Sequence, residues 1–267
     1  MALLDIVVLA LIQGVTEFLP ISSSGHLILW PLLTGRPDQG VTMDVAVHAG
    51  TLAAVCLYFR RDLAGLFAGT LHLVTGRTGT PQSRLALLIA LATVPAVIAG
   101  LALKVTGTDE ALRSVAVIGW ATLVGGVLLW VADRAPERRG GETWGLREAL
   151  FMGLAQALAL IPGTSRSGIT MTAARALGFR REDAARLSLL MAIPVILAAT
   201  LVETAGLVAD GDFRVGTELL AGAFLSFLAA LAALVVMMRM FRGTWTMTPF
   251  VVYRLGLGVA LIAIAHG

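Results

Sequence analysis

The chain has 267 residues, of which 57% are hydrophobic and only 14% are charged, whereas charged residues make up about 25% of a typical soluble domain. So few polar residues cannot coat a soluble particle of this size, and so many apolar residues exclude a disordered chain. The net charge is +3, and the basic residues are nineteen arginines and one lysine in short clusters between apolar stretches. These clusters are typical of loops that set membrane topology. We therefore expect the lipid bilayer as a partner and no nucleic acid.

The apolar residues form long blocks separated by polar segments, which predicts an all-α polytopic membrane protein. A helix needs roughly 17–25 residues to cross a hydrocarbon core of about 30 Å. Six blocks reach or approach that length, and we predict that they are transmembrane helices. In chain order they cover about 43–59, 85–103, 115–132, 187–208, 219–241 and 250–266.

Four shorter apolar pieces occur as two pairs ahead of these spans. A polar segment with a proline interrupts each pair, LPISSSGH at 19–26 and IPGTSRSG at 161–168. Short apolar pieces are more often re-entrant than spanning, and broken backbone at membrane depth persists only where protein or water satisfies its polar groups. We therefore predict four short re-entrant helices. They cover about 2–17, 23–34, 146–160 and 167–178.

One short pair followed by three spans occurs twice, which indicates an internal repeat within a single membrane domain. The first repeat covers 1–132 and the second covers 146–267. A self-comparison at an offset of 143 pairs Gln13 with Gln156 and brings the two polar breaks into register within one residue. The sequence therefore predicts that the two breaks have equivalent places in the two repeats.

The distribution of basic residues predicts the orientation of the chain. Thirteen lie in the loops at 60–84, 133–147, 179–186 and 239–249, and four lie in the loops at 35–42, 104–114 and 209–218. The basic-rich loops should face the cytoplasm. The two repeats are then inverted relative to one another, and inverted repeats with broken helices place a site near the membrane midplane.

The first break and the helix before it hold an amide, a carboxylate, three hydroxyls and an imidazole. Gln13 and Glu17 are four residues apart and share one helix face, where their oxygens suit a hard divalent cation. His26 follows Ser23 by three residues, a spacing that suits a nucleophile and its base. The alternative is that the serines cap a helix while Glu17 and His26 reach the membrane interface. The hydroxyls belong to Ser22, Ser23 and Ser24.

The second break has the composition of an anion-binding loop. Arg166 offers a planar, always charged fork that suits phosphate, and the hydroxyls and the start of the next helix add donors. The alternative is a capped turn in which Arg166 pairs with a carboxylate, for which Glu17 is the candidate if the two breaks meet. The remaining residues of the proposed loop are Gly163, Thr164, Ser165 and Ser167.

Polar residues outside the breaks are less informative. Asp44 and His48 begin a span four residues apart, and we interpret them as a capped helix end. Arg254 and Arg175 are expected to lie near the interface or in ion pairs. Glu203 is assigned to an acidic loop outside the membrane.

The segments QGVTEFLPISSSGHL at 13–27 and PGTSRSG at 162–168 resemble the two signature motifs of the bacterial undecaprenyl-diphosphate phosphatases, the bacitracin-resistance membrane phosphatases. The segment MDVAVHAGTLAAVCLYFRRD at 43–62 also fits this family, so the resemblance covers nearly the whole chain. A local likeness to acid-phosphatase-type lipid phosphatases fails, because those require a histidine followed by an aspartate after the arginine motif. After Arg166 the sequence has only His266, at its C-terminus.

The resemblance implies hydrolysis of undecaprenyl diphosphate to the monophosphate and inorganic phosphate with a divalent cation, Mg²⁺ or Ca²⁺. This reaction recycles the lipid carrier of peptidoglycan synthesis and confers bacitracin resistance. It implies Gln13 and Glu17 for metal or water, Ser23 and His26 at the reacting phosphorus, and Arg166 on the diphosphate. It also implies the bacterial inner membrane, a site that opens outward, and a fold of six spans with re-entrant helices in inverted repeats.

Two questions stay open at the level of the sequence. Catalysis could pass through a phosphorylated Ser23 or His26, or Glu17 and His26 could activate water. Inverted repeats with broken helices are also how secondary transporters are built, so a transporter or flippase for a lipid phosphate or anion is the alternative function. The chain could also form a homodimer.

Overall fold

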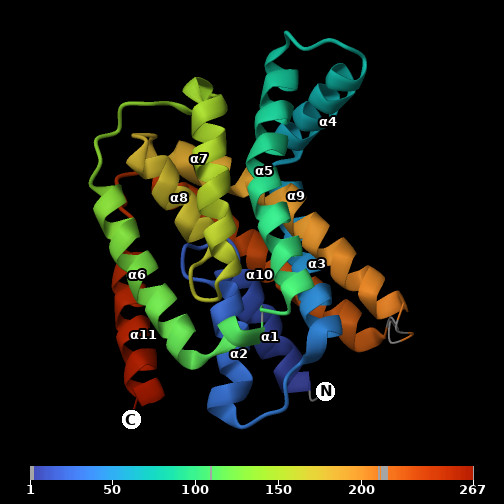
Figure 1. The fold of residues 1–267 in the computed structure, drawn as a ribbon, viewed down its shortest axis with the longest axis vertical. Helices are drawn as coiled ribbons and strands as arrows, with labels where there is room; N and C mark the ends of the chain where they lie inside the picture. Colours follow the sequence, from blue (N-terminus) through green and yellow to red (C-terminus); the bar gives the residue numbers. More distant parts are fainter. Residues whose placement is uncertain (1–2, 109, 210, 212–215, 267) are drawn as a thin grey trace.

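The computed structural model describes residues 3–108, 110–209, 211 and 216–266. Within these residues the chain forms eleven α-helices and three short 3-10 helices. The described part contains no β-strand and has one isolated bridge, between Arg139 and Phe179. The helices do not share one direction, because some run along the long axis of the molecule and others cross it obliquely (Figure 1).

Six of the described helices are long and apolar enough to cross a membrane, which confirms the predicted polytopic all-α fold. Several begin earlier than the apolar blocks, because their first turns are polar. Helix α5, for example, is capped by the Thr80 hydroxyl, which accepts from the Ser83 amide at 3.1 Å, and has Pro81 at its first position. The six helices are α3 (Gly40–Tyr58), α5 (Pro81–Thr106), α6 (Val115–Asp133), α9 (Arg181–Ala209), α10 (Thr217–Arg242) and α11 (Thr248–His266).

The four short helices are also present at their predicted places. They are α1 (Leu3–Thr16), α2 (Ser23–Thr34), α7 (Leu146–Ala157) and α8 (Arg166–Ala176), with the 3-10 helix η3 (Leu158–Leu160) after α7. Ser22 and Ser165 are the only non-glycine residues with positive φ in the described chain, at 75° and 69°. Each caps the next helix, accepting from the amide of Gly25 at 3.4 Å or of Gly168 at 3.1 Å. The two breaks therefore have the same local geometry.

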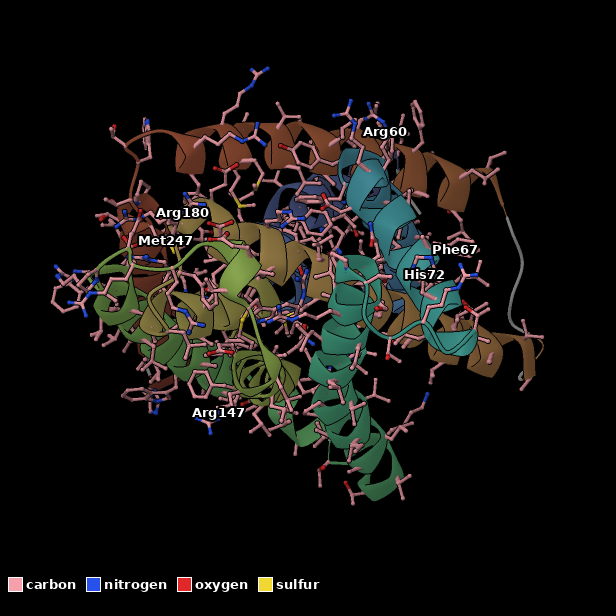
Figure 2. All side chains as sticks on the ribbon, turned by 90° about the horizontal axis from the view of Figure 1, so that it is seen from above. Arg60, Phe67, His72, Arg147, Arg180 and Met247 are labelled. Carbon is pink, nitrogen blue, oxygen red and sulfur yellow. The ribbon has the colours of Figure 1, made fainter. Side chains whose placement is uncertain are left out.

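An additional helix, α4 (Arg60–Val74), occupies the region predicted to be a basic loop. It packs against α5 and carries Arg60, Phe67 and His72, which are labelled in Figure 2. Phe67 is exposed on a helix that is amphipathic rather than uniformly apolar. The other two 3-10 helices of the described chain are η1 (Glu110–Arg113) and η2 (Gly141–Thr143).

Helices from one half of the chain pack against helices from the other half. Helix α1 packs on α10, and α7 packs on α5, while α6 lies along α11 and α3 along α10 (Figure 1). Small residues allow this contact: a Cβ added at Gly50 of α3 would lie 2.1 Å from the Ala223 carbonyl oxygen of α10. Close backbone approach at small residues is how helices associate without a hydrophobic driving force between them. The two repeats and their inversion stay a prediction.

Helix α8 lies at the centre of the fold, with nine of its eleven residues buried. Its last turn carries Arg175, which is fully buried, donates to the carbonyl oxygens of Asp133 at 3.0 Å and Ala135 at 2.6 Å, and forms ion pairs with Asp133 and Glu137. The expectation that Arg175 is paired is therefore confirmed. Because protein surrounds α8, its polar first turn faces the protein interior rather than lipid.

Candidate active site

The two breaks meet inside the protein. Ser167 donates its hydroxyl to the Leu19 carbonyl oxygen at 2.8 Å, which joins the second break directly to the first. Arg254 of α11 contacts both breaks, because it donates to the carbonyl oxygens of Pro20 at 3.1 Å and of Thr164 at 2.9 Å. It also donates to the carbonyl oxygens of Ala121, Thr122 and Gly163.

These hydrogen bonds give Arg254 a structural role. Its side chain is fully buried and donates to backbone carbonyl oxygens, so the prediction that Arg254 lies near the interface or in an ion pair is wrong. The breaks leave backbone carbonyl groups without helical partners, and buried carbonyl groups need donors. The guanidinium supplies five N–H groups, which satisfy carbonyl oxygens of both breaks and of α6.

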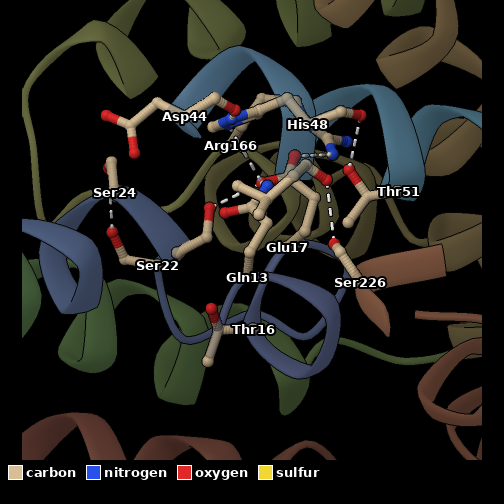
Figure 3. A network of polar contacts seen from close by, with 12 residues as sticks. Gln13, Thr16, Glu17, Ser22, Ser24, Asp44, His48, Thr51, Arg166 and Ser226 are labelled. Carbon is tan, nitrogen blue, oxygen red and sulfur yellow. Dashed lines mark hydrogen bonds and ion pairs between the residues drawn. The ribbon is translucent and has the colours of Figure 1, made fainter. Parts of the chain in front are cut away.

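Glu17 is the centre of the polar network, as Figure 3 shows. Its Oε1 accepts from Arg166 Nη2 at 3.1 Å, and its Oε2 accepts from Ser23 Oγ at 2.5 Å and Gln13 Nε2 at 3.1 Å. Glu17 is only 8% exposed, and a buried carboxylate requires such compensation. The pairing of Arg166 with Glu17, which was the alternative to an anion-binding loop, is therefore present. Gln13 lies beside Glu17 as expected, and the bond from Ser23 to Glu17 was not predicted.

Arg166 is held in a fixed direction. Its Nη1 donates to the Ser188 carbonyl oxygen at 3.2 Å while Nη2 contacts Glu17. The residue is the first of α8, directly after the Ser165 cap, so its head group lies at a helix N-terminus. Helix N-termini favour anions, and the guanidinium adds a charged donor at the same point.

A cavity of about 390 Å³ opens beside this pair, and both polar and apolar side chains line it. The polar lining includes Glu17, Ser23 and Arg166. A ligand with a charged head and a hydrocarbon body fits such a mixed lining, because each part can meet matching chemistry. The apolar lining includes Leu27, Ile28, Ala96, Leu160, Val195 and Ile196.

The other predicted substrate-binding residues divide into two groups. Ser22, Ser24 and Ser165 line the cavity. Ser167 and Thr164 are buried, bonded to Leu19 and Arg254 respectively. Gly163 has a φ of +93°, and an added Cβ would lie 2.5 Å from the Ile118 carbonyl oxygen. Gly163, Thr164 and Ser167 therefore shape the break, while the first three residues face the ligand space.

The structure does not form the predicted contact between Ser23 and His26. Ser23 turns to Glu17, and His26 Nδ1 bonds to the Ser22 carbonyl oxygen at 2.6 Å. The other ring nitrogen of His26 bonds to the Tyr253 hydroxyl at 2.5 Å, and the two rings stack with centroids 5.7 Å apart. The spacing suggested a shared face, but the imidazole is drawn toward α11.

A different histidine faces the cavity. His48 of α3 lines it, with Nε2 3.9 Å from Glu17 Oε2, beside the network in Figure 3. The interpretation of Asp44 and His48 as a capped helix end is wrong, because α3 begins at Gly40 with Gln39 as its N-cap residue. The four-residue spacing of Asp44 and His48 was the available signal, since it places both on one face.

Two further residues of the cavity were missed. Gln156 of α7 lines it and has a buried Oε1 without a hydrogen-bond partner. Its match with Gln13 in the repeat was the signal that could have found it. Glu203 also lines the cavity and lies within α9, so its assignment to an external loop is wrong.

The chemistry of the donor set fits a weakly held hard cation. Gln13 Oε1 is buried without a hydrogen-bond partner, while Nε2 of the same amide donates to Glu17 Oε2 at 3.1 Å. The described residues contain no group of three or more His, Cys, Asp and Glu side chains suited to a metal. Mg²⁺ is commonly held by one or two carboxylates together with substrate phosphates, so a complete protein cage is not required.

The fold and the site define a polytopic membrane protein with a buried polar centre where two broken helices meet. The chain matches the family model described as bacitracin resistance protein BacA over residues 6–260, and it belongs to that family. It is 54% identical to the undecaprenyl-diphosphatases of Jannaschia sp. (strain CCS1) and Dinoroseobacter shibae over the whole of each chain. It is 52% identical to the undecaprenyl-diphosphatase of Alcanivorax borkumensis over 96% of both chains.

Proposed function

We infer that the chain is an integral-membrane phosphatase that hydrolyses undecaprenyl diphosphate to undecaprenyl phosphate and inorganic phosphate. This activity recycles the lipid carrier of peptidoglycan synthesis and gives bacitracin resistance. Family membership and full-length relatives called undecaprenyl-diphosphatase support it. The observation in the structure that carries it is the Arg166–Glu17 pair beside a cavity that both polar and apolar side chains line.

The geometry suits a diphosphate attached to a lipid tail. The tail would contact the apolar residues of the cavity lining, so only the head group has to reach Glu17 and Arg166. Phosphoryl transfer depends mainly on positioning and on stabilisation of charge at the phosphoryl oxygens. Arg166 and the first turns of α2 and α8 direct donors at that point, and the hydroxyls of Ser22, Ser24 and Ser165 can donate to the same oxygens.

We propose that Ser23 and His26 lie at the reacting phosphorus when substrate is bound. Their side chains point in different directions in the structure. Ser23 already lies in the network through its bond to Glu17. His26 would have to turn from Tyr253 when substrate binds, which a rotation of its side chain allows.

Gln13 Oε1 and the Glu17 carboxylate are the groups that would hold a divalent cation, Mg²⁺ or Ca²⁺. The unpartnered amide oxygen supports this proposal. The cation would supply positive charge for the phosphoryl oxygens. The protein's own part is to hold the amide and the carboxylate in one place, which their four-residue spacing along one helix face does.

We propose that the protein lies in the bacterial cytoplasmic membrane with the site open to the outer face. The connections α4–α5 and α6–α7, which belong to the arginine-rich segments 60–84 and 133–147, lie at one end of the molecule, and α2–α3 and α5–α6 lie at the other (Figure 1). The first end is then cytoplasmic. Asp44, Arg113 and Glu203, which line the cavity, belong to the arginine-poor end. A homodimer stays a prediction.

The experiment that tests the function is the release of inorganic phosphate. Purified protein with undecaprenyl diphosphate and Mg²⁺ should liberate phosphate in detergent. The alternative, a lipid-phosphate transporter, is favoured by the matched geometry of the two breaks at Ser22 and Ser165. If the protein moved labelled lipid across vesicle membranes but released no phosphate, the transporter would be the correct function.

A further inference from the structure

We propose that the protein binds one anionic phospholipid of the surrounding bilayer between the end of α6 and the start of α11. The lipid phosphate lies on Arg134, and an acyl chain follows the start of α11. The inference goes beyond the phosphatase activity and starts from a second cavity of about 290 Å³. This cavity shares no lining residue with the one that holds Glu17 and Arg166.

The charged lining of the second cavity has one guanidinium more than it has carboxylates. Asp133 forms ion pairs with Arg181 at 2.7 Å and Arg175 at 3.4 Å. Glu137 pairs with the same two arginines at 2.8 Å and 3.7 Å. The third guanidinium, that of Arg134, has no carboxylate partner in the part of the chain that the structure describes. The unbalanced positive charge of the cavity is therefore on Arg134.

The guanidinium of Arg134 is already fixed in direction. Its Cζ lies 3.5 Å from the centroid of the Trp130 ring, and its Nη1 donates to the Trp130 carbonyl oxygen at 2.9 Å. Stacking uses the face of the guanidinium, and the carbonyl uses one of its five N–H groups. The other N–H groups have no acceptor among the described residues. They can bind a phosphate at two points, and a side chain fixed in advance loses little freedom on binding.

A hydroxyl of α11 adds a second donor to the same cavity. Thr246 Oγ1 donates to Thr248 Oγ1 at 2.8 Å and accepts from the Thr248 amide at 3.3 Å. The hydrogen of the Thr248 hydroxyl therefore points elsewhere, and within the described chain it has no acceptor. Both threonines line the cavity, so this hydrogen can be donated to a phosphate oxygen. Helices α6 and α11 then each contribute one donor.

An open groove of about 520 Å³ continues from the cavity and favours a lipid over a soluble anion. Thr246 and Thr248 line both spaces. Beyond them the groove is lined by apolar side chains that include Trp245 and Val252, which are 56% and 64% exposed. A phosphate in the cavity would thus be followed by hydrocarbon in the groove. Phospholipids have this order of groups, whereas free phosphate would leave the groove empty.

The depth of the site in the bilayer also fits a phospholipid. Helix α6 ends at Asp133 and α11 begins at Thr248, so the cavity lies where two spans leave the membrane. Trp130 and Trp245 are typical of the interface between membrane and water. Basic pockets between helices on the cytoplasmic side bind anionic head groups, and this end is the one that we assign to the cytoplasm. The bound lipid would connect the ends of α6 and α11.

Binding of phosphatidylglycerol to the purified full-length protein tests the inference. Native mass spectrometry in detergent gives the apparent Kd of the first bound lipid. Arg134→Gln should raise this Kd by about tenfold or more, because it removes a charged donor. Thr248→Val should raise it by about threefold, because it removes one neutral hydrogen bond at nearly constant volume.

The matched control is Arg147→Gln, which removes the same charge from an exposed arginine of the segment 133–147. Arg147 lies apart from Met247, whose neighbours Thr246 and Thr248 line the cavity (Figure 2). The Kd of this variant should stay within about twofold of wild type, because general attraction between a basic surface and anionic lipid depends little on one charge. An equal rise for Arg134→Gln and Arg147→Gln would overturn the inference.

Two further probes identify what is recognised. Phosphatidylcholine should bind about tenfold more weakly than phosphatidylglycerol, because its choline group cancels the charge of its phosphate. Inorganic phosphate in large excess should not displace the lipid. Equal binding of the two lipids, displacement by inorganic phosphate, or an unchanged Kd for Arg134→Gln would each contradict the proposed site. If Arg134→Gln failed to fold, the comparison of Thr248→Val with Arg147→Gln would decide.

Discussion

Arg166 donates from Nη2 to Oε1 of Glu17 at 3.1 Å, although 149 positions separate the two residues in the chain. Arg166 lies in the second break and Glu17 directly before the first, and each break contains a serine with positive φ that caps the next helix. The pair thus marks the point where the two halves of the sequence meet. The charged head group of the proposed diphosphate substrate would bind at the same point.

Replacing Arg166 by lysine should lower kcat much more than it raises KM. Lysine keeps the charge but loses the planar fork that can contact a phosphoryl group and Ser188 together. Loss of a donor that stabilises the transition state costs about 100-fold or more in kcat. Steady-state phosphate release measures both constants. Equal kcat values for Arg166→Lys and wild type would show that charge alone is sufficient.

Replacing Arg254 by methionine should destabilise the fold rather than alter the chemistry selectively. The change leaves five buried carbonyl interactions without their donor, and each unsatisfied buried group costs about 1–3 kcal/mol. We expect a loss of at least about 3 kcal/mol in the free energy of unfolding in detergent. The matched control is Arg134→Met, since Arg134 is exposed and bonds to one carbonyl oxygen, of Trp130. Comparable stability of both variants would refute this role.

Adding a methyl group at Gly50 should separate α3 from α10. The new Cβ would lie 2.1 Å from the Ala223 carbonyl oxygen, which is backbone and cannot move independently. Overpacking of this kind costs about 1–3 kcal/mol, which unfolding of Gly50→Ala in detergent would measure. Gly65→Ala is the control, because Gly65 has open space around its Cβ position and should be tolerated. An unchanged stability for Gly50→Ala would mean that the helices are farther apart.

Removal of divalent cations should abolish activity, and Gln13→Leu should weaken the response to added Mg²⁺. The substitution removes the unpartnered amide oxygen of Gln13 and the bond from its Nε2 to Glu17. We expect the Mg²⁺ concentration for half-maximal activity to rise about tenfold, and direct binding of Mn²⁺, followed by electron paramagnetic resonance, to weaken in parallel. Gln82→Leu, at an exposed position of α5, is the control. Full activity in a chelator would contradict the cation proposal.

The proposed orientation predicts which cysteines an impermeant reagent reaches. In a Cys56→Ser background, Thr108→Cys at the arginine-poor end should be labelled on intact spheroplasts. Thr78→Cys in the connection α4–α5 should be labelled only after the membrane is opened. Both positions are exposed in the structure, so access depends on the side of the membrane. The reverse pattern would invert the topology.

The sequence predicts the helices well because the bilayer and the breaks impose simple constraints. Hydrocarbon thickness fixes the length of a span, so α6 and α11 differ from their predicted ranges by only a few residues. The serine- and proline-containing breaks were visible because polar residues are rare in such blocks. Glu17 and Arg166 were also predictable as partners, since each lies in or beside one of the two breaks.

Residues whose place depends on tertiary packing were not predictable. Arg254 satisfies the Pro20 carbonyl from 234 positions away, and nothing near it in the sequence indicates that carbonyl. His48 belongs to the site only because α3 packs beside Glu17. His26 was assigned to the correct break, yet its ring direction depends on Tyr253 of α11. Periodicity identifies a helix face, but the neighbour of that face follows from the fold.

Phosphate release by folded Glu17→Ala and Arg166→Ala, compared with wild type, is the most direct test of the claim that the meeting point of the two breaks is the phosphatase centre. Both variants should retain the elution profile of wild type in size-exclusion chromatography and lose phosphate release by about 100-fold or more. Phosphate release at the wild-type rate by either folded variant would contradict this assignment of the active site.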